Sequence, residues 1–234
     1  MTDLRSAAEL AGAVDIRLPN ESADYRAART ALLAEEIELR RQIERVAALR
    51  RALPPGGIVS DTYRFVSENG GEIALADMFG RHDTLITYHW MFGVMRKRPC
   101  PMCTGFLGGL AAAVGDLTQK VAVAAIAGAP IERQIAFKLE RGWGALPLYQ
   151  PVGDAFFTDY GGIGPDGSDI PAINVFERTA DGIRHFYAAE MTGETADPGQ
   201  DPRGAPDLML IWTLFDLTRK GRDPHWYPAL TYPA

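Results

Sequence analysis

The chain has 234 residues, 47% of them hydrophobic and 23% charged, which is typical of a globular protein and not of a disordered one. Its formal net charge of -6 disfavours nucleic acid and anionic membrane surfaces as partners. No run of 18 apolar residues is present, and residues 1–20 carry several charges, so we expect a cytoplasmic protein without membrane contact. Two cysteines cannot form a disulfide framework for a chain of this size.

The N-terminal part is predicted to be helical. We expect residues 1–21 to be a flexible N-terminus and residues 22–53 to be one long helical arm that opens at Ser22 and ends at the prolines and glycines of 54–57. Apolar residues recur at sevenfold spacing along this helix. They are Tyr25, Leu32, Leu39, Val46 and Leu53. The stripe either packs on its own domain or forms a homodimer contact, and the sequence leaves both open.

Residues 54–234 are expected to form one α/β domain. β-Branched and aromatic residues around an Asn-Gly-Gly turn predict a hairpin at 62–80. Strands at 84–92 and 120–127 alternate with helices that start after the cysteines and at Pro130, which predicts a βαβ unit with parallel strands. The remaining expected elements are a strand at 146–150, an antiparallel hairpin at 171–190, a loop near 193–206 and a helix within 206–221.

Both cysteines lie in one short segment. Cys100 falls at the start of a helix that follows a buried strand, and Cys103 lies one turn further in, so the two sulfurs share a side of that helix. Free N–H groups and the helix dipole favour a thiolate at Cys100, and the basic run at 96–98 adds positive charge. This placement suits disulfide exchange, in which Cys100 attacks and Cys103 closes the ring.

Two other interpretations of the cysteine pair stay open. Cysteine is a small hydrophobe, so the pair could simply be core residues. A lone Cys-x-x-Cys is also half of a tetrahedral metal site. The nearby side chains that suit a soft metal such as copper or zinc are His89, Met91, Met95 and Met102.

The order strand, Cys-x-x-Cys helix, strand, crossing helix, proline-headed hairpin and final helix resembles the thioredoxin-like superfamily. Within it, the chain is similar to a family of largely uncharacterised bacterial proteins described as predicted dithiol-disulfide oxidoreductases. The resemblance covers roughly residues 50–225. The stretches that carry it are ALADMFG at 74, TYHWMFG at 87, CPMC at 100, GAPIERQIAFKLERGWG at 128, IPAINVF at 170 and FDLTRKGRD at 215.

The resemblance implies a thioredoxin-like fold, a central mixed sheet flanked by helices, and three catalytic positions. Cys100 matches the attacking cysteine and Cys103 the resolving one. Pro171 matches the proline that is cis and packs beside the dithiol in thioredoxin-like proteins. No acidic residue stands where thioredoxins keep a buried carboxylate, so His89 is the candidate proton acceptor for Cys103.

These observations predict a thiol-disulfide oxidoreductase that needs no organic cofactor and acts on a disulfide-containing substrate or redox partner protein. One alternative is a thioredoxin-like carrier of copper or zinc. The other is a thiol peroxidase acting through Cys100, although Pro99 directly before it does not fit the Thr-x-x-Cys pattern of peroxiredoxins.

Overall fold

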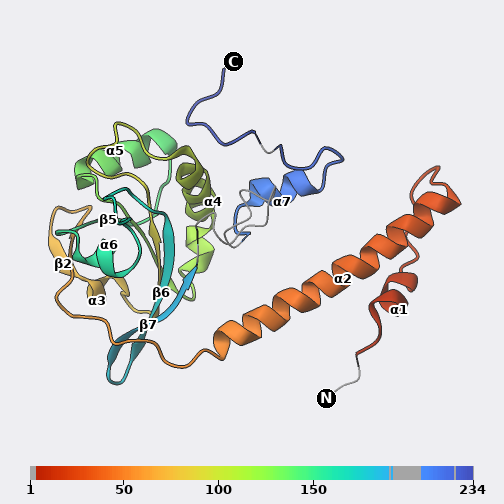
Figure 1. Cartoon of the computed structure of the whole chain (residues 1–234), viewed down its shortest axis with the longest axis horizontal. Coiled ribbons are helices and arrows are strands. Elements are labelled where there is room, and N and C mark those ends of the chain that lie inside the picture. The colour runs from red at the N-terminus through yellow and green to blue at the C-terminus, as the bar shows by residue number, and fades with distance from the viewer. Residues whose placement is uncertain (1–3, 190, 192–206, 224, 234) are drawn as a thin grey trace. The chain divides into compact units, whose positions relative to one another are not determined.

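The computed structural model describes residues 4–189, 191, 207–223 and 225–233, and the chain forms two compact units, residues 1–54 and 55–234. The loop expected near 193–206 lies outside the described residues. No helix in the described part combines the length and the apolar character needed to cross a membrane. Figure 1 shows the elements and their labels.

The first unit is built around helix α2, Ala23–Arg51, which confirms the predicted long helix. Its start is fixed locally, because the Ser22 side chain accepts a 3.1 Å hydrogen bond from the N–H of Tyr25. The apolar stripe on α2 is largely exposed, with Leu32 and Leu39 each 58% accessible. Within its own unit, therefore, this face of α2 is not covered.

A second helix, α1 (Ala7–Gly12), lies in the segment that was expected to be flexible. Ser6 and Glu9 form a capping box, in which each side chain bonds the backbone N–H of the other residue. The helix packs on α2 through a small apolar contact formed by Ala7, Ala11 and Ile37. The Ser-x-x-Glu spacing is the local signal that the sequence-based expectation overlooked.

The second unit contains a seven-stranded mixed sheet with the strand order β2-β1-β5-β4-β3-β6-β7. The strands are β1 (Arg64–Ser67), β2 (Glu72–Ala74), β3 (Thr84–His89), β4 (Ala122–Ile126), β5 (Leu148–Pro151), β6 (Ala172–Thr179) and β7 (Gly182–Ala189). Strands β3, β4 and β5 are mutually parallel, whereas β6 is antiparallel to β3 and β7 to β6. Both predicted hairpins are present as β1–β2 and β6–β7.

Strands β4-β3-β6-β7 form the thioredoxin-like arrangement that the sequence predicts. Helix α4 (Pro101–Leu117) connects the parallel pair β3 and β4, and helix α5 (Ile131–Arg141) follows β4. Central strand β4 is buried along its whole length, as expected for a strand covered on both faces. The fold is therefore α/β with a thioredoxin-like core and a long N-terminal helix.

Two apolar layers cover the two faces of the sheet. Helices α4 and α5 pack on one face through Leu107, Val114 and Phe137. On the other face lie α3 (Leu75–Met78) and α6 (Ala155–Asp159), with Phe156 and Phe157 in the core. Because successive strand residues point to opposite faces, each residue of β3 faces either the α4 layer or the α6 layer.

Some boundaries differ from the expected ones. Strand β2 is short, because the chain turns into α3 at Leu75, where the Asp77 carboxylate accepts a 2.8 Å hydrogen bond from the N–H of Ala74. The closing helix α7 spans only Leu210–Asp216. Helix α5 ends as predicted at Gly142, which has a φ of 67°, a left-handed conformation that glycine adopts easily.

Candidate active site: a dithiol at the start of helix α4

Cys100 is the N-cap residue of α4. Its backbone is extended, with φ -61° and ψ 126°, and Pro101 occupies the first helical position, where its missing N–H is not needed. The Cys100 carbonyl accepts the first helical bond, 3.0 Å from the N–H of Thr104, and a second bond of 2.9 Å from the Thr104 hydroxyl. Cys100 is partly exposed, whereas Cys103 is buried.

The surroundings of Cys100 favour its thiolate and lower its pKa to about 6. The main cause is a hydrogen bond from the Cys103 thiol, and burial opposes it. Backbone N–H groups of Met102 and Cys103 and the charge of Arg96 add to the lowering. At pH 7 a thiol with this pKa is about 90% ionised.

Cys103 is the protonated partner in this pair. Its side chain is only 2% exposed, and its pKa is raised by the hydrogen bond to Cys100, by burial and by the neighbouring Cys100 charge. The hydroxyl of Tyr88 and the N–H of Met91 donate to the Cys103 sulfur and oppose that rise. These interactions leave the proton on Cys103 and the negative charge on Cys100.

Tyr88 is a site residue that the sequence did not reveal, and His89 is a predicted one that lies elsewhere. Tyr88 faces the α4 layer and stacks at 4.4 Å, between ring centroids, on Phe106. The His89 ring lies on the opposite face, 5.1 Å from the ring of Phe157. Its pKa is lowered to about 3 by burial. The expectation that His89 accepts the Cys103 proton is therefore wrong, because strand alternation points it away from the dithiol.

The same geometry removes His89 from the set of metal ligands near the cysteines. Within the described residues, no three His, Cys, Asp or Glu side chains come together in a way that could hold a metal ion. Met91 packs against the α4-side core, next to the dithiol. The cysteines thus lack the imidazole ligand that the soft-metal alternative would take from β3.

The loop between β3 and α4 is fixed by contacts from distant segments. The Asp169 carboxylate accepts hydrogen bonds of 3.0 Å from the N–H of Gly93 and 2.8 Å from Nε of Arg96. The guanidinium of Arg133 donates 2.6 Å to the Arg96 carbonyl. Arg98 forms an ion pair with Glu140. Arg96 is thereby held within electrostatic range of Cys100.

Pro171 lies where the predicted hairpin begins. It directly precedes β6, whose first residue Ala172 pairs with His89, the last residue of β3. Pro171 is half-buried and lies at the same end of the sheet as the last residue of β3. The chain leaves β3 toward Cys100 at this end. Its catalytic role and the cis form of its peptide bond stay predictions.

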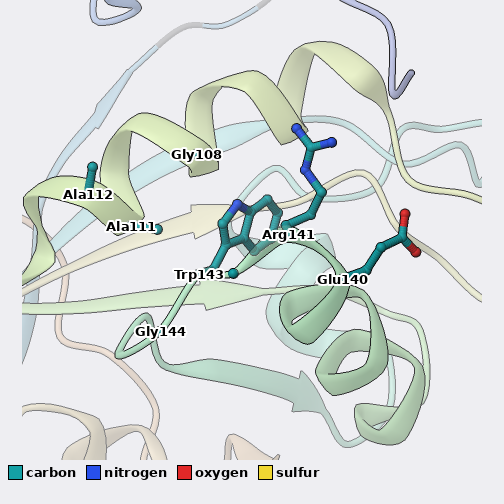
Figure 2. Close-up of a pocket in the computed structure, with 8 residues that line it drawn as sticks. Gly108, Ala111, Ala112, Glu140, Arg141, Trp143 and Gly144 are labelled. Carbon is teal, nitrogen blue, oxygen red and sulfur yellow. The ribbon is translucent and has the colours of Figure 1, made fainter. Parts of the chain in front are cut away.

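A pocket of about 410 Å³ lies between α4 and the end of α5 (Figure 2). Small residues of α4 line one side, and Trp143 lies between that helix and the turn after α5. Its two charged residues already have partners, since Glu140 pairs with Arg98 and Arg141 donates 3.2 Å to the carbonyl of Leu230. Neither cysteine lines it, and none of its lining residues is next to a cysteine in the sequence.

Fold and site together define a thioredoxin-like protein with a Cys-x-x-Cys pair at a helix N-terminus. The chain belongs to the family described as "Bacterial protein of unknown function (DUF899)", which matches residues 17–232. No curated protein is significantly similar to it.

Several solved structures resemble the chain weakly. Peroxidoxin BcpB of Mycobacterium tuberculosis is 15% identical, with a TM-score of 0.43 over 53% of this chain and 79% of that one. A mutant of PrxQ from Xylella fastidiosa is 12% identical, with a TM-score of 0.46 over 58% and 84%. A peroxiredoxin-like protein from Aquifex aeolicus is 13% identical, with a TM-score of 0.44 over 58% and 75%. At such scores the fold assignment rests on the strand order and directions given above.

Proposed function

We propose that this protein is a thiol-disulfide oxidoreductase in which Cys100 attacks and Cys103 resolves. The observation that carries the proposal is the placement of a partly exposed Cys100 at the N-cap of α4, one turn before a buried Cys103 whose thiol favours the Cys100 thiolate. A cysteine placed in this way is accessible, and it is mostly in the thiolate form at neutral pH. These are the two requirements for attack on a disulfide.

The reaction proceeds in two exchange steps. The Cys100 thiolate attacks one sulfur of the substrate, the substrate S–S bond breaks, and the other sulfur leaves as a thiolate that takes up a proton. Cys103 then loses its proton, attacks the Cys100 sulfur and releases the second substrate thiol. Two electrons pass from the dithiol to the substrate, and an external dithiol returns the protein to its reduced form.

Tyr88 supports the second step. Burial raises its own pKa well above the usual value, so its hydroxyl stays protonated and can donate a hydrogen bond but not act as a base. That donor is hydrogen-bonded to the Cys103 sulfur and stabilises negative charge there as Cys103 ionises. No nearby base is assigned, and the departing substrate thiolate or solvent takes the proton.

Single cysteine variants test the assignment with bis(2-hydroxyethyl) disulfide as substrate and dithiothreitol as reductant. We expect Cys100→Ser to lose at least about a hundredfold in kcat/KM, because it removes the nucleophile. In a single exposure to the disulfide without dithiothreitol, Cys103→Ser keeps the attacking thiol and accumulates a mixed disulfide on Cys100, detected by mass spectrometry of the intact protein.

The same preparations decide between this function and the two alternatives. Turnover by both variants at the wild-type rate would overturn the proposal. Near-stoichiometric copper or zinc that survives dialysis, without disulfide turnover, would support a metal carrier. Consumption of hydrogen peroxide through Cys100, again without disulfide turnover, would support a peroxidase.

A further inference from the structure

A large apolar pocket lies beside the dithiol, within residues 55–234. Its volume is about 910 Å³, which is in the range of small-molecule sites. One wall is α4, another is the sheet at β3 and β6, and the third is the C-terminal segment that includes α7. Figure 1 shows α7, in blue, next to α4. The segment contacts α4 closely, since a Cβ at Gly105 would lie 3.1 Å from Cε of Met209.

Neither cysteine lines the pocket, but residues that adjoin each of them do. Pro101, which directly follows Cys100, is one of them, and so is Tyr88, whose hydroxyl donates to the Cys103 sulfur. Apolar side chains such as Ile173, Val175 and Leu214 make up most of the remaining wall. A molecule in this pocket therefore contacts Pro101 and Tyr88, which adjoin the two cysteines.

Four polar side chains of the pocket wall, Thr87, Thr104, Arg141 and Tyr232, each take part in a hydrogen bond within the protein. Thr87 Oγ1 donates to the Asn174 carbonyl at 3.4 Å, and Thr104 Oγ1 donates to the Cys100 carbonyl at 2.9 Å. Arg141 donates to the Leu230 carbonyl at 3.2 Å. The Tyr232 hydroxyl accepts a 3.1 Å hydrogen bond from the Ala229 N–H. Tyr88 is bonded to Cys103. The described lining thus has few groups left to satisfy the amides of a peptide, whose burial without partners is costly.

We infer that this pocket binds the apolar substituent of a small organic disulfide, so that the disulfide bond is presented to Cys100. The inference rests on the proposed function and names its substrate class. Exchange then follows the steps given above, with reduction of R–S–S–R to two R–SH and formation of the Cys100–Cys103 disulfide. Dithiothreitol returns the dithiol in the assay.

Two nearly isosteric substrates test it. Dipropyl disulfide and bis(2-hydroxyethyl) disulfide differ only in a terminal methyl or hydroxyl on each arm. For each disulfide, kcat/KM is divided by the rate constant of its uncatalysed reduction by dithiothreitol. We expect this ratio to be at least about tenfold higher for dipropyl disulfide, because only the methyl can be buried without losing hydrogen bonds.

A pocket-filling variant with a matched control completes the test. Gly109 lines the pocket on α4, and a Cβ there meets no atom within 4 Å, so Gly109→Leu fills the space without a clash. Gly115 is also on α4, is exposed, has equally open space and does not line the pocket. Gly109→Leu should reduce the preference for dipropyl disulfide about tenfold, and Gly115→Leu should keep it.

The outcomes separate this inference from the proposed function. Equal normalised rates for the two disulfides, or equal preference in wild type and Gly109→Leu, would overturn the apolar site while leaving disulfide reduction in place. Turnover of neither disulfide by the wild-type protein would overturn both.

Discussion

Cys100 and Cys103 lie three positions apart in the same segment, but their pKa values are shifted in opposite directions. Cys100 at the N-cap receives hydrogen bonds from the Cys103 thiol and from N–H groups of the first turn, and its pKa falls to about 6. Cys103 is buried one turn deeper, and the adjacent thiolate and the loss of water raise its pKa. The position of the pair at the helix start thus makes Cys100 the nucleophile and Cys103 the resolving thiol.

The pH dependence of alkylation follows from this division. The rate at which iodoacetamide modifies Cys100 should reach half its maximum near pH 6. Below that pH it should fall about tenfold for each pH unit, because only the thiolate reacts. Mass spectrometry of the reduced protein over a pH series measures this. Cys103→Ala removes the main stabilising hydrogen bond, so its midpoint should move to higher pH. A wild-type midpoint near that of free cysteine would contradict the assignment.

At the scale of elements, the β3–α4 loop connects the strand to the reactive helix. Gly93 and Arg96 of this loop share the carboxylate of Asp169, which belongs to the segment just before Pro171. A Cβ on Gly93 would lie 2.4 Å from an Asp169 oxygen, so a larger residue at this position would push the carboxylate out of its contact. The contact joins the two segments that bring Cys100 and Pro171 to one end of the sheet.

Replacement of Asp169 tests this connection. Asp169→Ala frees Arg96, so the pKa of Cys100 should rise and the protein should lose about 1 kcal/mol of stability. Alkylation against pH and urea unfolding measure the two effects. Asp166→Ala is the control, because the side chain of this exposed residue of the same loop accepts hydrogen bonds from Ser168 and not from Gly93 or Arg96. Equal midpoints in Asp169→Ala and wild type would remove Arg96 from the site.

For the whole molecule, the open question is the exposed face of α2. Leu32, Leu39 and Ile43 are each more than half exposed, although sevenfold apolar spacing is typical of helices that pair. The core between α1 and α2 is small and lies on other positions of the helix. Because nothing within its own unit covers the apolar stripe of this 29-residue helix, we propose that the stripe pairs with a second copy of the chain.

We expect the full chain to be a homodimer formed through this stripe. The double variant Leu32→Glu, Leu39→Glu should dissociate to monomers, because it buries carboxylates in the apolar contact. Sedimentation equilibrium measures the mass. Arg40→Glu changes the net charge by the same amount at an exposed position outside the stripe and should remain dimeric. A monomeric wild-type chain at high micromolar concentration would contradict this expectation.

The sequence by itself determined the features that depend on neighbours within a few positions. The start of α2 at Ser22, the stop of α5 at Gly142 and the placement of Cys100 at a helix N-cap all depend on bonds between residues at most four apart. Periodicity likewise identified the parallel pair β3 and β4 and the hairpin β6–β7.

Only the tertiary structure decided which strand residue meets the dithiol. Alternation along β3 separates Tyr88 from His89, but the sequence does not say which face α4 covers. The hydrogen bond from Gly93 to Asp169 joins residues 76 positions apart, and the apolar pocket combines α4 with a segment near the C-terminus. Such contacts exist only after the sheet order brings distant segments together, because no local propensity encodes them.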